Sequence, residues 1–266
     1  MKIFCISIID KNFKEFKKLN LTPVGLGLNK FDKNWLNDKS GQNISSKNLN
    51  FGEYTFHYSL WKNKKLISNP NDWIGFCSYR RFWTKRKNSK PRNFSELSKN
   101  IIQKPEKKWE NYDVVLGEPL IFKKIKNIKL VKENFFEVLK KPSMMYSNNT
   151  LEDQFRVFHG SFFLDQAIDL LPKKYQEDFK DFLNGYILHP YNMFICKNFN
   201  ILTKFYNEIF PWLFRCEKKF KNCNLDGYNK VRIYGFLAER FMPFWFKKYT
   251  NYKTMPLLFK DISELD

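Results

Sequence analysis

A short apolar run at the N-terminus places the first constraint on how this chain can fold. Residues 2–9, KIFCISII, are almost all apolar and rich in isoleucine. A run of this length is typical of a strand buried on both faces, as in the sheets of α/β proteins. It is too short for a signal peptide, and no stretch approaches the roughly 20 apolar residues that span a bilayer. We therefore expect an α/β fold that begins with this strand.

The remaining pattern predicts a mixed sheet flanked by helices, with a helix-rich C-terminal half. Further short strands are expected at 72–82, 112–116 and 189–197. Aromatic residues at helical spacing predict helices at 53–64, 151–171, 176–184, 199–214 and 229–246. Residues 22–50 are rich in Gly, Asn, Asp and Ser and are expected to form a loop, and residues 84–110 an exposed segment with one short helix. We expect one domain over 1–266, with parts 1–120 and 121–266.

The charge of the chain favours anionic partners. Lysine and arginine total 47 against 27 acidic residues, a net charge of +20. Nucleic acid, anionic lipid and nucleotide diphosphates are all attracted by such a surface. Part of the lysine excess matches the Lys-, Asn-, Ile- and Phe-rich usage of an AT-rich genome. The five cysteines form no zinc or disulfide pattern, which fits a reducing cytosol.

Two adjacent arginines close the predicted strand at 72–82. In Ser78-Tyr79-Arg80-Arg81 the guanidinium groups follow a buried strand, and guanidinium forks match diphosphate oxygens. Ligands of open α/β sheets bind beyond the carboxyl ends of the strands. The alternative is a surface pair that bridges to acids of a neighbouring helix. Since neighbouring side chains of a strand alternate in direction, one of the two arginines is expected to face the ligand.

Other polar residues offer weaker candidates. A loop that leads into a helix carries groups suited to sugar hydroxyls, or equally to helix capping: Asp38, Asn43, Ser45, Asn48 and Glu53. Polar residues within the aromatic second half include His159, Asp165, His189 and Asn192. His57 faces the core side of its helix and is expected to be structural. Late in the chain, Arg232 and Glu239 share a helix face, and with Arg240 their default interpretation is ion pairing.

Several catalytic signatures do not occur. The sequence has no G-x-G-x-x-G, P-loop, G-x-S-x-G or H-E-x-x-H motif. It also has no Asp-x-Asp at a strand end, where many nucleotide-sugar enzymes hold a divalent metal. Dependence on Mn²⁺ or Mg²⁺ and metal-independent action both remain open.

The order of the motifs resembles bacterial glycosyltransferases of capsule and exopolysaccharide assembly. The N-terminal motifs are D-x-x-G-x-N-I-S-x-x-N, E-x-T, W-K-N and G-F-C-x-Y-R-R-F, which stand here at Asp38–Asn48, Glu53–Thr55, Trp61–Asn63 and Gly75–Phe82. The later ones are Tyr112–Val115, Gln154-Phe155, Asn192–Ile195 and Gly235–Arg240. Ser78 stands where the family usually has histidine, and Ile9-Asp10 where its first strand usually ends in His-Lys.

This resemblance implies a fold like that of GT-A enzymes, with the nucleotide sugar bound above the strand ends by residues 1–120 and the acceptor on the side of 121–266. It implies that Arg80 or Arg81 contacts the phosphates. The other residues expected at the donor are Val24, Gly25, Asn43, Ser45, Tyr79 and Asn192. The catalytic candidates are Glu118, Asp165, Glu239 and His159, and an acceptor-binding or structural role is expected for His189, Arg232 and Arg240.

The function implied is transfer of a sugar, such as galactose in pyranose or furanose form, from a nucleotide diphosphate to a glycan hydroxyl. A UDP-sugar is the favoured donor, and the acceptor is expected to be a lipid-linked capsular, exopolysaccharide or lipopolysaccharide glycan at the inner face of the cell membrane. Two alternatives remain: a basic nucleic-acid-binding module and a non-catalytic scaffold of polysaccharide assembly. The scattered lysines and the buried periodicity of the aromatics argue against specific nucleic-acid binding.

Overall fold

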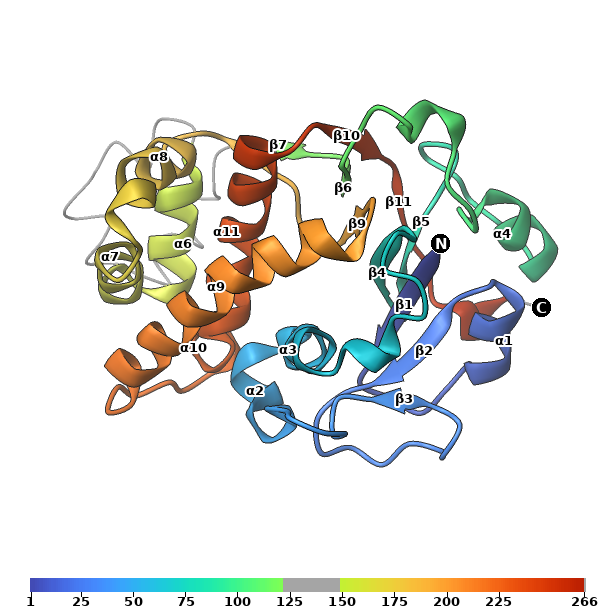
Figure 1. Cartoon of the computed structure of the whole chain (residues 1–266), viewed down its shortest axis with the longest axis horizontal. Coiled ribbons are helices and arrows are strands. Elements are labelled where there is room, and N and C mark those ends of the chain that lie inside the picture. The colour runs from blue at the N-terminus through green and yellow to red at the C-terminus, as the bar shows by residue number, and fades with distance from the viewer. Residues whose placement is uncertain (122–148, 266) are drawn as a thin grey trace. The chain divides into compact units, whose positions relative to one another are not determined.

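The computed structural model describes residues 1–121 and 149–265, which form two compact units. The first comprises 1–118, 191–207 and 246–266, and the second 119–190 and 208–245. The first unit therefore gathers three separate stretches of the chain around one sheet (Figure 1).

The first unit is built on a mixed sheet with the strand order β10-β6-β9-β4-β1-β2-β3. The bounds are β1 Lys2–Ser7, β2 Thr22–Gly25, β3 Leu36–Asn37, β4 Ile74–Ser78, β6 Val114–Gly117, β9 Phe194–Cys196 and β10 Tyr252–Met255. β1 runs parallel to β2 and β4, and β6 runs parallel to β10. β9 is antiparallel to both β4 and β6. Two shorter strands, β5 (Arg81–Trp83) and β11 (Leu257–Phe259), pair with each other beside β4.

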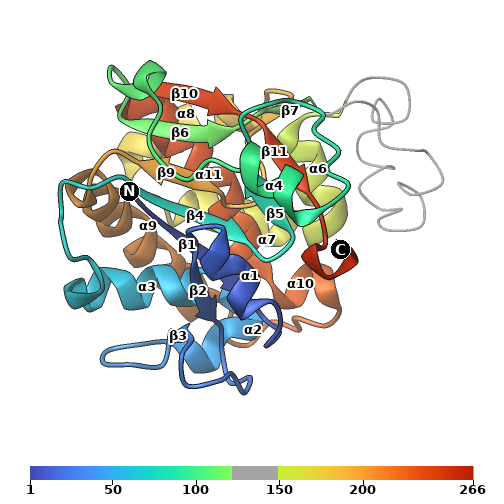
Figure 2. The ribbon, with the colours of Figure 1, turned by 90° about the vertical axis from the view of Figure 1, so that its right-hand side faces the viewer.

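Successive side chains of β1 point to opposite faces of this sheet, and apolar side chains on both faces pack against helices. Phe4 of β1 and Phe76 of β4 stack at 5.8 Å on one face, where Phe56 of α3 (Tyr54–Lys62) covers them. Ile3 and Cys5 point to the other face, against α1 (Phe13–Lys18) and α4 (Phe94–Asn100). In Figure 1, α1 and α3 lie on opposite sides of β1 and β2, and Figure 2 shows the same strands from the side. The expected mixed α/β fold is confirmed.

The second unit is mainly helical. Its helices are α6 (Leu151–His159), α7 (Ser161–Asp169), α8 (Lys173–Leu183) and α10 (Tyr228–Val231), and a two-stranded sheet pairs β7 (Leu120–Ile121) with β8 (Ile187–Leu188). The unit also contains most of α9 (Phe199–Phe220) and α11 (Ile233–Tyr249). Its core is aromatic: Phe179 contacts Trp212, Phe241 and Phe244 at centroid distances of 5.1–6.1 Å.

Several segments differ from the sequence expectation. The expected strand at 72–82 is divided into β4 and β5, and the expected helix at 229–246 into α10 and α11. The expected loop at 22–50 contains β2, β3, a 3-10 turn at Ser45–Lys47 and α2 (Asn48–Phe51). β2 reads Thr-Pro-Val-Gly, which is short and contains two turn formers, but it pairs along its whole length with β1. The expected helix at 151–171 is broken at Gly160, whose φ of 98° favours glycine and separates α6 from α7.

The buried His57 predicts a specific pH dependence of stability. Its Nδ1 lies 2.7 Å from the Tyr206 hydroxyl, and burial lowers the pKa of His57 to about 3 from 6.5. The folded state therefore binds fewer protons than the unfolded state between these values, so stability is lost as the pH falls from about 6.5 towards 3. We expect His57→Gln to reduce this slope by about 1.4 kcal/mol per pH unit. Urea unfolding at pH 7, 6 and 5 measures the free energy of unfolding of both proteins. The same pH dependence in the variant and the wild type would contradict the lowered pKa of His57.

Candidate functional site

The strand order places a topological switch point between β1 and β4. The chain proceeds from β1 outward to β2 and β3, then returns to the opposite side of β1 to form β4. In open α/β sheets such a reversal leaves a crevice at the carboxyl ends of the two strands, because the connections leave in opposite directions. Here Ser7 ends β1 and Ser78 ends β4 at this edge.

The segments that follow β1 and β2 are joined by a hydrogen bond at this edge. The Ser7 hydroxyl donates to the Ile9 carbonyl at 2.7 Å and accepts from the Ile9 N–H at 3.1 Å. The Asn29 side chain donates to the Ile8 carbonyl at 2.9 Å. Three apolar side chains nevertheless remain exposed on these segments, namely Ile8, Ile9 and Leu28. The edge therefore has a fixed backbone and an apolar rim available to a ligand.

A buried carboxylate holds the turn after β2. Both Asp38 oxygens accept from the Gly27 N–H, at 3.0 and 3.2 Å, and the carboxyl group is fully buried. Burial raises the pKa of Asp38, while hydrogen bonds from Thr55 and Gly27 oppose the rise. Gly27 has φ 66°, and a Cβ there would lie 2.8 Å from Asn48 Cβ. The conformation and the packing both require glycine.

Asn43 and Ser45, which were expected to bind the nucleotide sugar, form hydrogen bonds within the polar loop itself. The Asn43 amide donates to the carbonyls of Lys39 and Gly41, and its oxygen accepts from the Ser45 hydroxyl at 2.9 Å. Val24 and Gly25 are buried in β2, next to the switch point. Asn43 and Ser45 thus shape the segment that lies beside the carboxyl edge.

Ser78 presents an unusual hydroxyl at the end of β4. Its Oγ is buried and has no hydrogen-bond partner among residues 1–121 and 149–265. A buried hydroxyl without a partner is rare, because its desolvation is not compensated. Ile6 of β1 is level with Ser78 in the sheet. This hydroxyl lies at the switch point, where a ligand group could supply the missing hydrogen bond.

The two arginines that follow Ser78 take different positions. The Arg80 guanidinium lies 4.7 Å from the Tyr79 ring centroid and donates to the Tyr79 hydroxyl. The Arg81 guanidinium lies 4.2 Å from the Tyr191 centroid and 5.4 Å from that of Phe259. Within the described part of the chain, neither forms an ion pair with a carboxylate, although Arg80 lowers the pKa of Asp261 after the larger effect of Ser263. Two guanidinium groups without an ion pair to a described carboxylate therefore follow the end of β4 at the switch point.

The antiparallel strand β9 brings a further polar group to the same edge. Because β9 runs opposite to β4 and β6, its N-terminal end lies at their carboxyl ends. Continuing both registers puts Asn192 level with Ser78 on one side and with Glu118 on the other. Asn192 donates to Glu53 Oε1 at 2.6 Å and accepts from the Tyr54 hydroxyl at 3.3 Å.

The approach to Asn192 is conformationally strained. Tyr191 and Asn192 have φ values of 72° and 52°. Asparagine tolerates this left-handed region, whereas for Tyr191 it costs about 1–2 kcal/mol. Strain of this kind is concentrated at ligand sites. Asn192 and Glu53 belong to separate sequence motifs, and their proximity depends on the direction of β9, which no local pattern indicates.

Glu118 follows β6 at the carboxyl edge. Its carboxylate pairs with Lys87 Nζ at 3.1 Å, and its side chain is one-third exposed. Adjacent strands are about 4.8 Å apart, so Glu118 lies roughly 10 Å from Ser78, across β9. Glu118 and Glu53 are thus two carboxylates near the edge that also carries the arginines.

The remaining predicted residues belong to the second unit. Burial, and then the charge of Arg240, lower the pKa of His159 to about 3, and its Nδ1 lies 2.8 Å from the Asn229 carbonyl. Asp165 pairs with Arg156 at 2.6 Å, and Glu239 pairs with Arg240 at 2.7 Å.

The second unit also contains the predicted acceptor-side residues. The buried Arg240 donates to Gln154 as well, and its Nε has no partner among the described residues. Arg232 lies over the Tyr228 ring, and His189 is buried. Arg232 and Arg240 thus take part in contacts within that unit.

Two features do not occur within residues 1–121 and 149–265. These residues contain no group of three or more His, Cys, Asp or Glu side chains arranged to hold a metal ion. They also contain no helix with the length and apolar character needed to cross a bilayer.

The turn after β2 provides a direct test of the edge geometry. We expect Gly27→Ala to lower the free energy of unfolding by about 1–3 kcal/mol, because it adds backbone strain and a contact with Asn48. Leu28→Ala, at an exposed neighbouring position, should stay within about 0.5 kcal/mol of wild type. Chemical denaturation of both variants measures the difference. Equal stability of the two would show that the turn is not held as described.

Comparison with known proteins adds a fold and a family. The chain is similar to the apo structure of the WbbM bifunctional glycosyltransferase, with a TM-score of 0.71 and 20% sequence identity. The likeness covers 98% of this chain and 45% of that one, so this chain spans less than half of that protein's length. At this identity the likeness shows a shared fold. A comparison with curated proteins gives no match.

The sequence itself matches a family model over residues 5–251, which is most of the chain. The protein therefore belongs to the family described as domain of unknown function DUF4422.

Proposed function

We propose that this protein is a glycosyltransferase that moves a sugar from a nucleotide diphosphate to a hydroxyl of a glycan. The observation that carries the proposal is the pair Arg80 and Arg81, which lack carboxylate partners within the described residues, beside the switch point of an α/β sheet. The fold shared with a bifunctional glycosyltransferase supports it.

The proposed donor site uses three features of the carboxyl edge. Arg80 or Arg81 neutralises the diphosphate, because a guanidinium donates two parallel hydrogen bonds to phosphate oxygens. The Ser78 hydroxyl, which lacks a partner among the described residues, donates to a phosphate or sugar oxygen. The exposed Ile8, Ile9 and Leu28 offer apolar contact to the nucleobase, next to the turns at Val24–Gly27. These features occupy one edge of one unit.

The proposed reaction breaks the bond between the sugar C1 and the diphosphate oxygen and forms a bond between C1 and the acceptor oxygen. The nucleotide diphosphate leaves with the bonding electron pair, and the arginines stabilise the charge that develops on it. The acceptor hydroxyl gives its proton to a carboxylate. Glu118 follows β6 at the carboxyl edge that also carries Ser78, and Glu53 hydrogen-bonds Asn192 at the start of β9. Both belong to the first unit, so we favour them over Asp165 and Glu239 of the second unit.

The finer assignments are part of the same proposal. A UDP-hexose, with galactose as one candidate, is the favoured donor. The favoured acceptor is a lipid-linked glycan of capsule, exopolysaccharide or lipopolysaccharide at the inner face of the cell membrane. The net charge of +20 would attract the protein to anionic lipid there.

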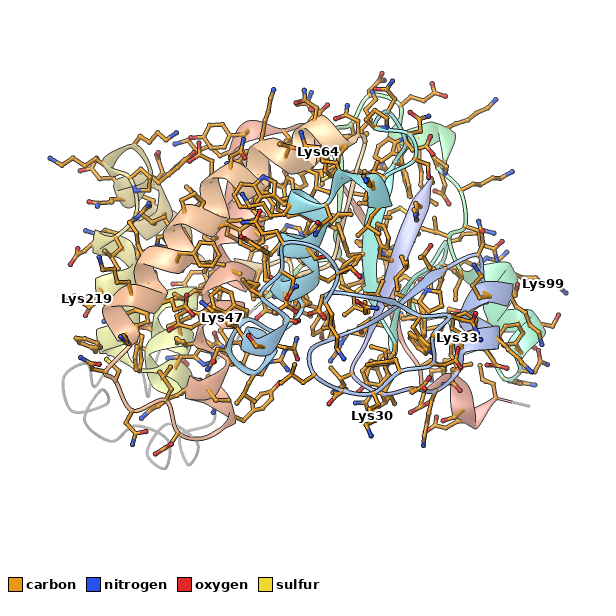
Figure 3. All side chains as sticks on the ribbon, turned by 60° about the horizontal axis from the view of Figure 1, so that its bottom comes forward. Lys30, Lys33, Lys47, Lys64, Lys99 and Lys219 are labelled. Carbon is orange, nitrogen blue, oxygen red and sulfur yellow. The ribbon has the colours of Figure 1, made fainter. Side chains whose placement is uncertain are left out.

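The basic surface is compatible with this proposal without implying nucleic-acid binding. Figure 3 labels lysines from different elements of both units, including Lys30, Lys64, Lys99 and Lys219. A nucleic-acid interface would instead combine clustered cations with exposed aromatic rings on one surface.

Donor binding tests the role of the arginines. We expect calorimetry to detect binding of UDP, and Arg80→Gln or Arg81→Gln to weaken it at least tenfold because a charged phosphate contact is lost. Arg92→Gln removes the same charge from an exposed position and should leave binding unchanged. The titrations are run with and without Mn²⁺ or Mg²⁺. Equal affinity in all three variants, or binding of generic DNA with no affinity for nucleotides, would contradict the proposal.

Transfer kinetics test the carboxylates. We expect Glu118→Gln or Glu53→Gln to lower kcat at least a hundredfold while UDP affinity stays within twofold, because a general base contributes about 10²–10⁴ to the rate. The assay supplies a panel of nucleotide sugars and glycan acceptors and detects the released nucleotide diphosphate. If both variants retain wild-type kcat, neither carboxylate is the base. A wild-type protein that binds donor but transfers nothing would favour the scaffold alternative.

A further inference from the structure

A second cationic site lies in the first unit, in the segment that follows β5. A pocket of about 580 Å³ is formed there between residues 85–91 and α4. Its lining includes Lys85, Arg86, Lys90 and Lys99, with Glu96 as the one acidic residue. The volume is in the range of small-ligand pockets, about 300–1,000 Å³.

The walls of this pocket are fixed by hydrogen bonds. The Lys85 N–H donates to the Asn100 carbonyl at 2.9 Å, next to a bridge between Thr84 and Ile101. The Lys85 ammonium donates to the Lys99 carbonyl at 2.9 Å, and the Asn100 amide donates to the Glu96 carbonyl at 3.1 Å. The loop and α4 are therefore held together before any ligand binds, which reduces the entropic cost of binding.

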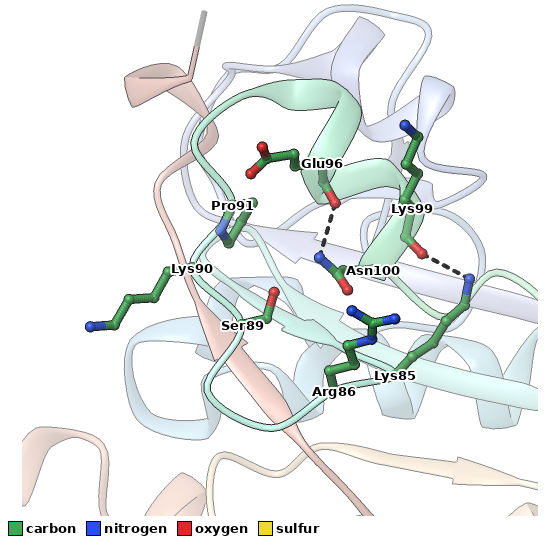
Figure 4. Close-up of a pocket in the computed structure, with 8 residues that line it drawn as sticks. All are labelled: Lys85, Arg86, Ser89, Lys90, Pro91, Glu96, Lys99 and Asn100. Atoms are coloured by element: carbon green, nitrogen blue, oxygen red, sulfur yellow. Dashed lines mark hydrogen bonds between the residues drawn. The ribbon is translucent and has the colours of Figure 1, made fainter.

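The charges of the pocket are not neutralised internally. The Arg86 guanidinium has no hydrogen bond or ion pair with any residue in 1–121 and 149–265. The Glu96 carboxylate accepts from the Arg92 N–H at 2.9 Å. In Figure 4, the side chains of Arg86, Ser89 and Asn100 point toward one another, whereas Lys90 and Lys99 extend outward. A guanidinium and a hydroxyl thus converge, surrounded by further cations, while the Asn100 amide nitrogen is held by the Glu96 carbonyl.

We propose that this pocket binds a phosphate-bearing ligand. Phosphate accepts hydrogen bonds at its non-bridging oxygens and carries one or more negative charges, which matches a guanidinium fork supported by a hydroxyl donor. Four cations against one carboxylate disfavour a cationic ligand and leave a carboxylate ligand with fewer contacts than a phosphate. The volume accommodates more than one phosphate group, so a diphosphate fits as well.

The pocket is linked to the carboxyl edge. Lys87, in the same loop, pairs with Glu118, one of the two carboxylates proposed as the base. A phosphorylated group held in the pocket would therefore lie in the same unit as the proposed donor site. The binding proposal itself does not depend on sugar transfer, since it concerns only the pocket and its anion.

Two arms of one experiment distinguish the source of the phosphate. The first titrates the full chain with inorganic pyrophosphate by calorimetry in 150 mM salt. The second measures sedimentation with vesicles of phosphatidylglycerol and phosphatidylcholine, against vesicles of phosphatidylcholine alone. Each arm compares wild type, Arg86→Gln, and Arg92→Gln, which removes the same charge just outside the pocket. Arg81→Gln reports binding at the switch point separately, and thermal melts confirm that each variant is folded.

We expect Arg86→Gln to weaken binding at least tenfold in one arm, while Arg92→Gln stays within twofold. Loss in the pyrophosphate arm identifies a soluble phosphorylated ligand, and loss in the vesicle arm identifies a lipid headgroup. Equal behaviour of Arg86→Gln and Arg92→Gln in both arms would overturn the proposal, as would an absence of binding in both. A loss seen only with Arg81→Gln would also overturn it, while supporting the donor site.

Discussion

The central strand β1 determines the arrangement of the first unit, because it is buried on both faces and pairs on both edges. Phe4 and Ile3 pack into opposite layers, and β2 and β4 flank the strand in parallel. A chain that places consecutive strands on opposite sides of one strand necessarily has a switch point at its carboxyl end. The position of the candidate site thus follows from burial of one apolar segment.

The polar residues at this edge serve two different purposes. Asp38 and Asn43 hydrogen-bond neighbouring backbone, Ser45 donates to the Asn43 side chain, and together they fix the segments beside this edge. Among the described residues, the Ser78 hydroxyl has no hydrogen-bond partner, and Arg80 and Arg81 form no ion pair with a carboxylate. The first set provides a rigid frame, and the second provides the groups that recognise an anion. The pocket around Arg86 repeats this division between a hydrogen-bonded frame and an uncompensated guanidinium.

The sequence was informative where burial or local chemistry decides structure. The apolar run at 2–9, the aromatic spacing of α3 and the arginines after β4 could each be interpreted from neighbouring residues. The strand at Thr22–Gly25 could not, because its pairing with β1 outweighs its turn-forming residues. The meeting of Asn192 with Glu53, and its level position beside Ser78 and Glu118, depends on the antiparallel direction of β9, which no local pattern reveals.

The most direct test of this account is a crystal structure of the protein with UDP bound. We expect the diphosphate at the carboxyl ends of β1 and β4, with a guanidinium of Arg80 or Arg81 within hydrogen-bond distance and the Ser78 hydroxyl hydrogen-bonded to the ligand. A diphosphate bound away from these strand ends, with both arginines still lying over Tyr79 and Tyr191, would contradict it.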